Sequence, residues 1–91
     1  MSKYRRAAKV DANQPEIVKQ LRDAGYTVHL PCDDILVGRN GVNLWVEIKQ
    51  PGQEKRLTPS ERERLENWRG AYLVASSFDD IHGWFMGVNR G

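Results

Sequence analysis

An Asn-Gly pair at positions 40 and 41 constrains the fold of this chain more than any other feature. It stands between two apolar segments, residues 34–37 and 42–50. Asn-Gly is the preferred two-residue turn of a β-hairpin, because both positions need positive φ angles that match the twist of paired strands. Residues 42–50 also alternate apolar and polar side chains, as a strand with one buried face does. The sequence therefore predicts an antiparallel hairpin.

Two helices flank this hairpin in the predicted order of elements. Pro15 suits the first turn of a helix, and Gly25 suits the residue that ends it. Thr58 and Glu61 have the spacing of a capping box, which marks the start of a second helix. The helices are expected at residues 15–24 and 59–69, and further strands at residues 26–30 and 71–76. Asp79 or Asp80 is expected to cap a last short helical turn that runs through Trp84 and Phe85.

The order helix-strand-strand-strand-helix-strand indicates an α/β fold. The final strand-helix-strand step favours parallel pairing through a right-handed crossover, whereas the hairpin is antiparallel. We therefore expect a mixed central sheet of about four strands with flanking helices. The 91 residues suffice for one domain, and residues 1–10 are expected to form a flexible basic tail.

Composition places the chain among soluble globular domains. Hydrophobic residues make up 40% and charged residues 29% of the sequence. No apolar run approaches the roughly 20 residues of a membrane helix, so no membrane association is expected. The single Cys32 excludes an internal disulfide and fits a reducing compartment. A cytoplasmic location is expected.

Basic residues cluster although the net charge is only +2. Residues 1–10 contain four of them and no acid, and Lys55 and Arg56 form a second group that Arg62 and Arg64 follow. Such clusters attract phosphate backbones. They are equally compatible with a solvated tail and an ordinary connecting loop. Charge alone therefore leaves a nucleic-acid partner open.

The hairpin brings three charged residues together. Strand alternation places Glu47 and Lys49 on one face and the apolar Val46 and Ile48 on the other. Asp34 begins the partner strand, and pairing about the turn brings it opposite the region of Glu47 and Lys49. A Glu-x-Lys step alone is a common surface ion pair. Combined with an Asp-led strand across a tight turn, it indicates a functional site.

These residue types suit metal-dependent hydrolysis of a phosphodiester. Magnesium prefers oxygen ligands, often one or two carboxylates with water and substrate phosphate. Asp34 and Glu47 can supply carboxylates, and the main-chain carbonyl of Ile48 a further oxygen. A bound cation neutralises the phosphate and activates water. Lys49 can orient or deprotonate that water, or stabilise the developing negative charge. The candidate catalytic residues are Asp34, Glu47 and Lys49.

Asp34 with residues 35–38, followed by Glu47, Ile48 and Lys49, resembles the PD-(D/E)xK nuclease motif. The details resemble its VRR-NUC branch, found in phage and bacterial proteins, and the similarity spans residues 11–80. The resemblance implies a restriction-endonuclease-like core and a DNA endonuclease that depends on Mg²⁺ or Mn²⁺. Small stand-alone members are similar to resolvases that act as homodimers on Holliday junctions.

The chain departs from that pattern at two places. Asp33 stands where the motif has its leading proline, although Pro31 is near. Many relatives carry a metal-reaching glutamate in the first helix, and the equivalent position here is Gln14, with Glu16 displaced by two residues. A second metal ion would need Gln14, Glu16 or the substrate to supply its missing ligand. The competing hypothesis is a catalytically silent module that keeps the fold and binds DNA or a protein.

Two further features have alternative interpretations. Trp45 is expected on the same strand face as Glu47, where it would either line the site and stack on a base or pack in the core. The loop at residues 53–56 either binds the DNA backbone or serves as a connector.

Overall fold

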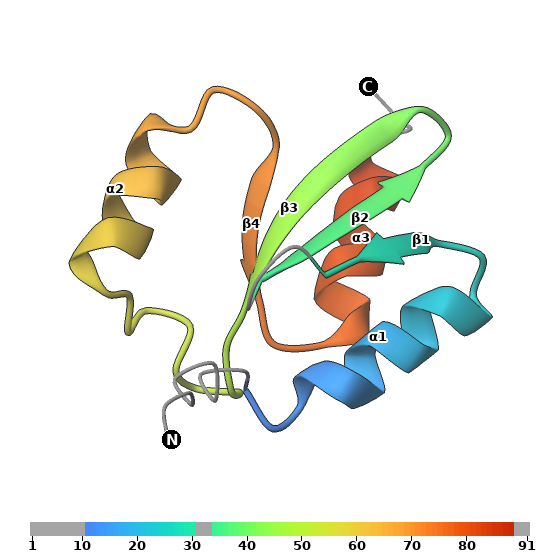
Figure 1. Ribbon diagram of the computed structural model, residues 1–91, viewed down its shortest axis with the longest axis horizontal. Helices are drawn as coiled ribbons and strands as arrows, with labels where there is room; N and C mark the ends of the chain where they lie inside the picture. The colour runs from blue at the N-terminus through green and yellow to red at the C-terminus, as the bar shows by residue number, and fades with distance from the viewer. Residues whose placement is uncertain (1–10, 31–33, 89–91) are drawn as a thin grey trace, which may run out of the picture.

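The computed structural model describes residues 11–30 and 34–88. The expected basic tail at residues 1–10, and Pro31, Cys32 and Asp33, lie outside these ranges. The elements along the chain are α1 (Gln14–Asp23), β1 (Thr27–His29), β2 (Ile35–Arg39), β3 (Val42–Ile48), α2 (Pro59–Asn67), β4 (Tyr72–Ala75) and α3 (Phe78–Val88) (Figure 1).

The four strands form one mixed sheet in the order β1-β2-β3-β4. The pairs β1–β2 and β2–β3 are antiparallel, and β3–β4 is parallel. The predicted α/β fold with a mixed four-stranded sheet is thereby confirmed, and α2 is the connection between the two parallel strands.

Asn40 and Gly41 form the predicted two-residue turn. Their φ angles are 54° and 79°, and the flanking residues Arg39 and Val42 pair with each other. These positive angles are what a hairpin turn of this length requires. The turn sets a register in which Ile35 pairs with Val46. One residue further along the same ladder, Asp34 stands opposite Glu47.

The core lies on one face of the sheet, beneath α1 and α3. Figure 1 shows these two helices together on one side, with α2 set apart at the other end of the sheet. Strand alternation turns every second side chain of β2 and β3 towards them. The buried apolar residues of these elements are Ile35, Val37, Leu44, Val46 and Ile48 from the sheet, Ile17, Val18 and Leu21 from α1, and Ile81 and Phe85 from α3.

Leu21→Ala is expected to lower the free energy of unfolding by about 3 kcal/mol, because Leu21 is fully buried and its loss leaves a cavity. Leu65→Ala, at an exposed leucine of α2, is the matched control and should change it by less than about 1 kcal/mol. Urea denaturation measures both. Equal effects of the two substitutions would contradict the position of the core.

The second helix differs from its prediction. It has no buried residues, and Trp68, which follows it, is 49% exposed. The sequence pattern predicts an apolar side of this helix with Leu57, Leu65 and Trp68, but Leu65 and Trp68 are exposed. The helix also ends at Asn67, because Trp68 takes an extended backbone with ψ of 125°. The predicted capping box of Thr58 and Glu61 is present.

The last helix is longer than expected. The sequence predicted a short turn capped by Asp79 or Asp80, whereas α3 spans 11 residues. The hydroxyl of Ser77 accepts a hydrogen bond from the Asp80 amide at 3.1 Å, so a serine provides the side-chain cap. Among the residues described, no helix is long and apolar enough to span a bilayer.

Candidate active site

The three predicted residues lie together on the sheet face opposite the core. Asp34 precedes β2, Glu47 belongs to β3, and Lys49 follows β3. Asp34 is 6% exposed and Glu47 is 8% exposed. The Lys49 Nζ atom lies 3.9 Å from Glu47 Oε2. The structure therefore brings the three side chains into one cluster, as the hairpin register predicts.

The end of β3 is held in place by the start of α1. Asn13 Nδ2 donates to the main-chain carbonyls of Lys49 at 3.0 Å and Ser76 at 3.1 Å. Gln50 Nε2 donates in turn to Asn13 Oδ1 at 3.0 Å. The Lys49 amide donates to the Ala75 carbonyl at 2.8 Å. These bonds fix the backbone from which the Lys49 side chain projects.

Asp34 accepts hydrogen bonds from two neighbours. Trp45 Nε1 donates to Asp34 Oδ2 at 2.7 Å, and Arg64 Nη1 of α2 lies 3.2 Å from the same oxygen. The Arg64 Cζ atom stands 4.5 Å from the centre of the Trp45 ring. Of the two interpretations of Trp45, the structure therefore supports lining of the site rather than packing in the core.

The helix α2 supplies residues that the sequence interpretation missed. Glu61 Oε1 accepts from Lys49 Nζ at 2.9 Å and from the Thr58 amide at 2.9 Å. Only the capping box was predicted for Glu61, and Arg64 was predicted only as one of the basic residues that could attract a phosphate backbone. Glu61 and Arg64 stand three residues apart, which places them on one face of α2. That spacing was the available signal.

The pKa values of Glu47 and Lys49 are both raised, for different reasons. Burial, and next the neighbouring Asp34 and Glu61 carboxyl groups, raise the pKa of Glu47 to about 9. Burial lowers the pKa of Lys49, but its hydrogen bond and charge interaction with Glu61 outweigh this and raise the pKa. Glu47 is therefore protonated at neutral pH, and Lys49 is an ammonium whose ionic partner is Glu61.

The oxygen atoms of this site fit a divalent cation. Two buried carboxyl groups face each other across the β2–β3 ladder, and a cation bound there would take the place of the proton on Glu47. The Lys49 amide donates to β4. The Ile48 carbonyl belongs to the same peptide unit, in which the N–H and C=O groups point in opposite directions. The carbonyl therefore faces β2, on the side where Asp34 lies. This donor set suits Mg²⁺ or Mn²⁺. Within residues 11–30 and 34–88, no group of three or more His, Cys, Asp or Glu side chains could hold a metal. A cation held by Asp34, Glu47 and the Ile48 carbonyl would therefore need water or substrate oxygen atoms as its remaining ligands.

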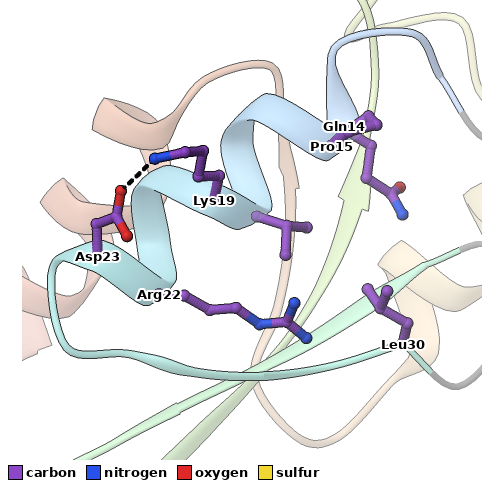
Figure 2. Close-up of a pocket in the computed structure, with 7 residues that line it drawn as sticks. Gln14, Pro15, Lys19, Arg22, Asp23 and Leu30 are labelled. Atoms are coloured by element: carbon purple, nitrogen blue, oxygen red, sulfur yellow. Dashed lines mark hydrogen bonds and ion pairs between the residues drawn. The ribbon is translucent and has the colours of Figure 1, made fainter.

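Gln14 and Glu16, the candidates for an additional metal ligand, lie in the first turn of α1. Gln14 is buried and lines a hollow of about 540 Å³ between α1 and Leu30 (Figure 2). Among the described residues its Oε1 atom has no hydrogen-bond partner. Glu16 is exposed on α1. In the part of the chain described, neither side chain hydrogen-bonds to Asp34 or Glu47.

Comparisons of the chain with protein families, with characterised proteins and with solved structures find no match. Functional interpretation therefore depends on the site itself. It combines two buried carboxyl groups, an ammonium and a guanidinium within a few ångströms. Cations of this kind bind phosphate oxygens, and carboxylates bind the metal ions that accompany phosphate chemistry.

Proposed function

We propose that this protein is a metal-dependent, structure-selective DNA endonuclease with a site of the PD-(D/E)xK, VRR-NUC type. One observation carries the proposal: Asp34 and Glu47 are both buried beside Lys49 on one face of a hairpin. Burying acidic groups next to each other costs free energy, so such clusters occur mainly where chemistry needs them. An ordinary surface ion pair would leave these side chains in water.

The side chains divide the work of phosphodiester hydrolysis. Asp34, Glu47 and the Ile48 carbonyl would hold Mg²⁺ or Mn²⁺, which supplies charge neutralisation of the phosphate and activation of water. The Lys49 ammonium is assigned to stabilising the negative charge that develops on the phosphate, because its raised pKa makes it a poor base. Glu61 keeps Lys49 charged and in position.

The proposed substrate is branched DNA such as a four-way Holliday junction, and the proposed assembly is a homodimer. A chain of 91 residues offers little surface for reading base sequence, which favours recognition of DNA shape. Two strands of a junction must be cut symmetrically, and a two-fold dimer presents two equivalent sites.

A cleavage panel and a metal titration test this function together. With Mg²⁺, a four-way junction should be cut in preference to plain duplex. Asp34→Ala should abolish detectable cleavage and weaken Mn²⁺ binding at least about tenfold in calorimetry, because it removes a charged ligand. Asp79→Ala, at an exposed acid of α3, is the matched control. The proposal fails if no substrate is cut or if Asp34→Ala cuts as well as the control.

The second candidate is a catalytically silent module that binds DNA or a protein. It is favoured by Gln14, an amide at the position where many members of the resembled family carry a glutamate. This candidate predicts that junction DNA binds without cleavage and that Mn²⁺ produces no heat that depends on Asp34. The titration above therefore separates the two.

A further inference from the structure

Arg64 lies beside both carboxyl groups of the candidate site. Its Nη1 atom lies 3.2 Å from Asp34 Oδ2 and 3.9 Å from Glu47 Oε1. These are the side chains that would hold the metal ion in the proposed function. A guanidinium at this position and a divalent cation bound to the same carboxyl groups would repel each other and compete for the same oxygen atoms.

We propose that Arg64 is a built-in substitute for the metal: in the metal-free protein it pairs with Asp34 beside Glu47, and a divalent cation displaces it so that it can bind a DNA phosphate. The inference rests on the proposed function for the metal and the DNA. It adds a phosphate-binding residue and a step that links metal loading to substrate binding.

The structure gives Arg64 room to move. Its side chain is 27% exposed, and α2 has no buried residue that ties the helix to the core. A hollow of about 320 Å³ lies beside it, lined by Ser60, Glu63, Asn67 and Trp68. The guanidinium rests against the Trp45 ring at the rim of the site. Partly exposed contacts of this kind are weak enough for a divalent ion to displace.

A displaced Arg64 has a chemical use at this position. The guanidinium is a planar fork that matches two oxygen atoms of a phosphate. Lys49 is less free to reach outwards, because Glu61 accepts its ammonium hydrogen bond at 2.9 Å. Metal and DNA would therefore favour the same rotated state of Arg64, so that each ligand strengthens binding of the other.

Arg64→Met tests the competition without DNA. Methionine keeps an unbranched apolar stem against Trp45 and removes the charge. Calorimetry with Mn²⁺ should show binding about fivefold tighter than in the wild type, the amount expected from the loss of one partly exposed ion pair. Arg62→Met removes the same charge from an exposed residue of α2 and should change the affinity by less than about twofold. Asp34→Ala gives the baseline without binding.

A second measurement uses the wild-type side chain. In the metal-free protein the Arg64 Nε–H group should give a distinct nuclear magnetic resonance signal, shifted by the Trp45 ring and absent in Arg64→Lys. Mg²⁺ should move it towards the signals of exposed arginines. DNA binding can be measured in the Lys49→Met protein, because this variant is expected to cleave the junction very slowly. In that background, Arg64→Met should weaken binding of the junction in the presence of Mg²⁺ about fivefold, as measured by fluorescence anisotropy.

The outcomes separate this inference from the proposed function. If Mn²⁺ binds the wild type and not Asp34→Ala, but Arg64→Met binds no tighter than Arg62→Met, only the inference is overturned. An Arg64 signal that stays in place while Mg²⁺ binds overturns it as well. If Mn²⁺ binds none of these proteins, the metal assignment in the proposed function fails and the inference fails with it.

Discussion

Replacing Lys49 with methionine is expected to reduce Mg²⁺-dependent cleavage of a four-way junction about 10² to 10³-fold in rate, the usual cost of removing one donor that stabilises transition-state charge. Lys49 is the only residue of the predicted triplet that carries a positive charge, and Glu61 holds its ammonium at 2.9 Å on the site face. Methionine keeps the length of the stem and removes the charge. Single-turnover kinetics with saturating protein measures the chemical step directly.

Two variants make this result specific. Lys55→Met, at an exposed lysine of the loop before α2, removes an equal charge and should leave the single-turnover rate within about threefold. Glu61→Gln keeps a side chain that suits the capping box but loses the negative charge beside Lys49, and about tenfold slower cleavage is expected. Cleavage by Lys49→Met at the rate of Lys55→Met would remove Lys49 from the chemistry.

The hairpin and its site were predictable because short-range rules determine them. Asn40 and Gly41 select a two-residue turn, and the turn sets the pairing of every residue in β2 and β3. Alternation then assigns Glu47 to one face and Val46 to the other. The cluster of Asp34 with Glu47 follows from these two rules and needs no knowledge of the rest of the fold.

The contributions of α2 were not predictable in the same way. Where a helix lies against a sheet depends on long-range packing, and α2 buries none of its residues. Its apolar pattern was therefore a poor guide, and Leu65 and Trp68 proved to be exposed. Arg64 and Glu61 enter the site through side-chain contacts that join residues 12 and more positions apart. Spacing on the helix shows that they share a face and does not show which face meets the site.

The third helix shows a different kind of error. Ile81 and Phe85 stand four residues apart and both are buried, which is the spacing of an amphipathic helix. The predicted helix is too short because it takes Asp79 or Asp80 as its N-terminal cap. In the structure Ser77 caps the helix, which therefore starts earlier. The helix was therefore present in the sequence pattern, and only its length was underestimated.

Binding of Mg²⁺ is expected to strengthen about tenfold for each pH unit between about pH 7 and 9 and then to level off. The cause is Glu47, whose pKa burial and the neighbouring Asp34 and Glu61 carboxyl groups raise to about 9. Below that pH the side chain must lose a proton before its carboxylate can bind a cation. Calorimetry in buffers of different ionisation heat should show about one proton released per ion near pH 7.

The same proton predicts how stability of the metal-free protein depends on pH. A glutamate in the unfolded chain has a pKa near 4.5, so between about pH 4.5 and 9 the folded state binds more protons at Glu47. The free energy of unfolding therefore falls as pH rises through this window. Glu47→Gln removes the cost of ionisation and should stabilise the metal-free protein by about 1 to 3 kcal/mol at pH 8 while weakening Mg²⁺ binding.

Glu63→Gln, at an exposed acid of α2, is the matched control and should alter neither stability nor Mg²⁺ affinity. Stabilisation by Glu47→Gln together with weaker metal binding would mean that this position is kept acidic at a cost to the fold, as a metal ligand requires. The opposite result, a Glu47→Gln protein that is no more stable than Glu63→Gln and binds Mg²⁺ equally well, would show that Glu47 is an ordinary buried acid and would remove it from the site.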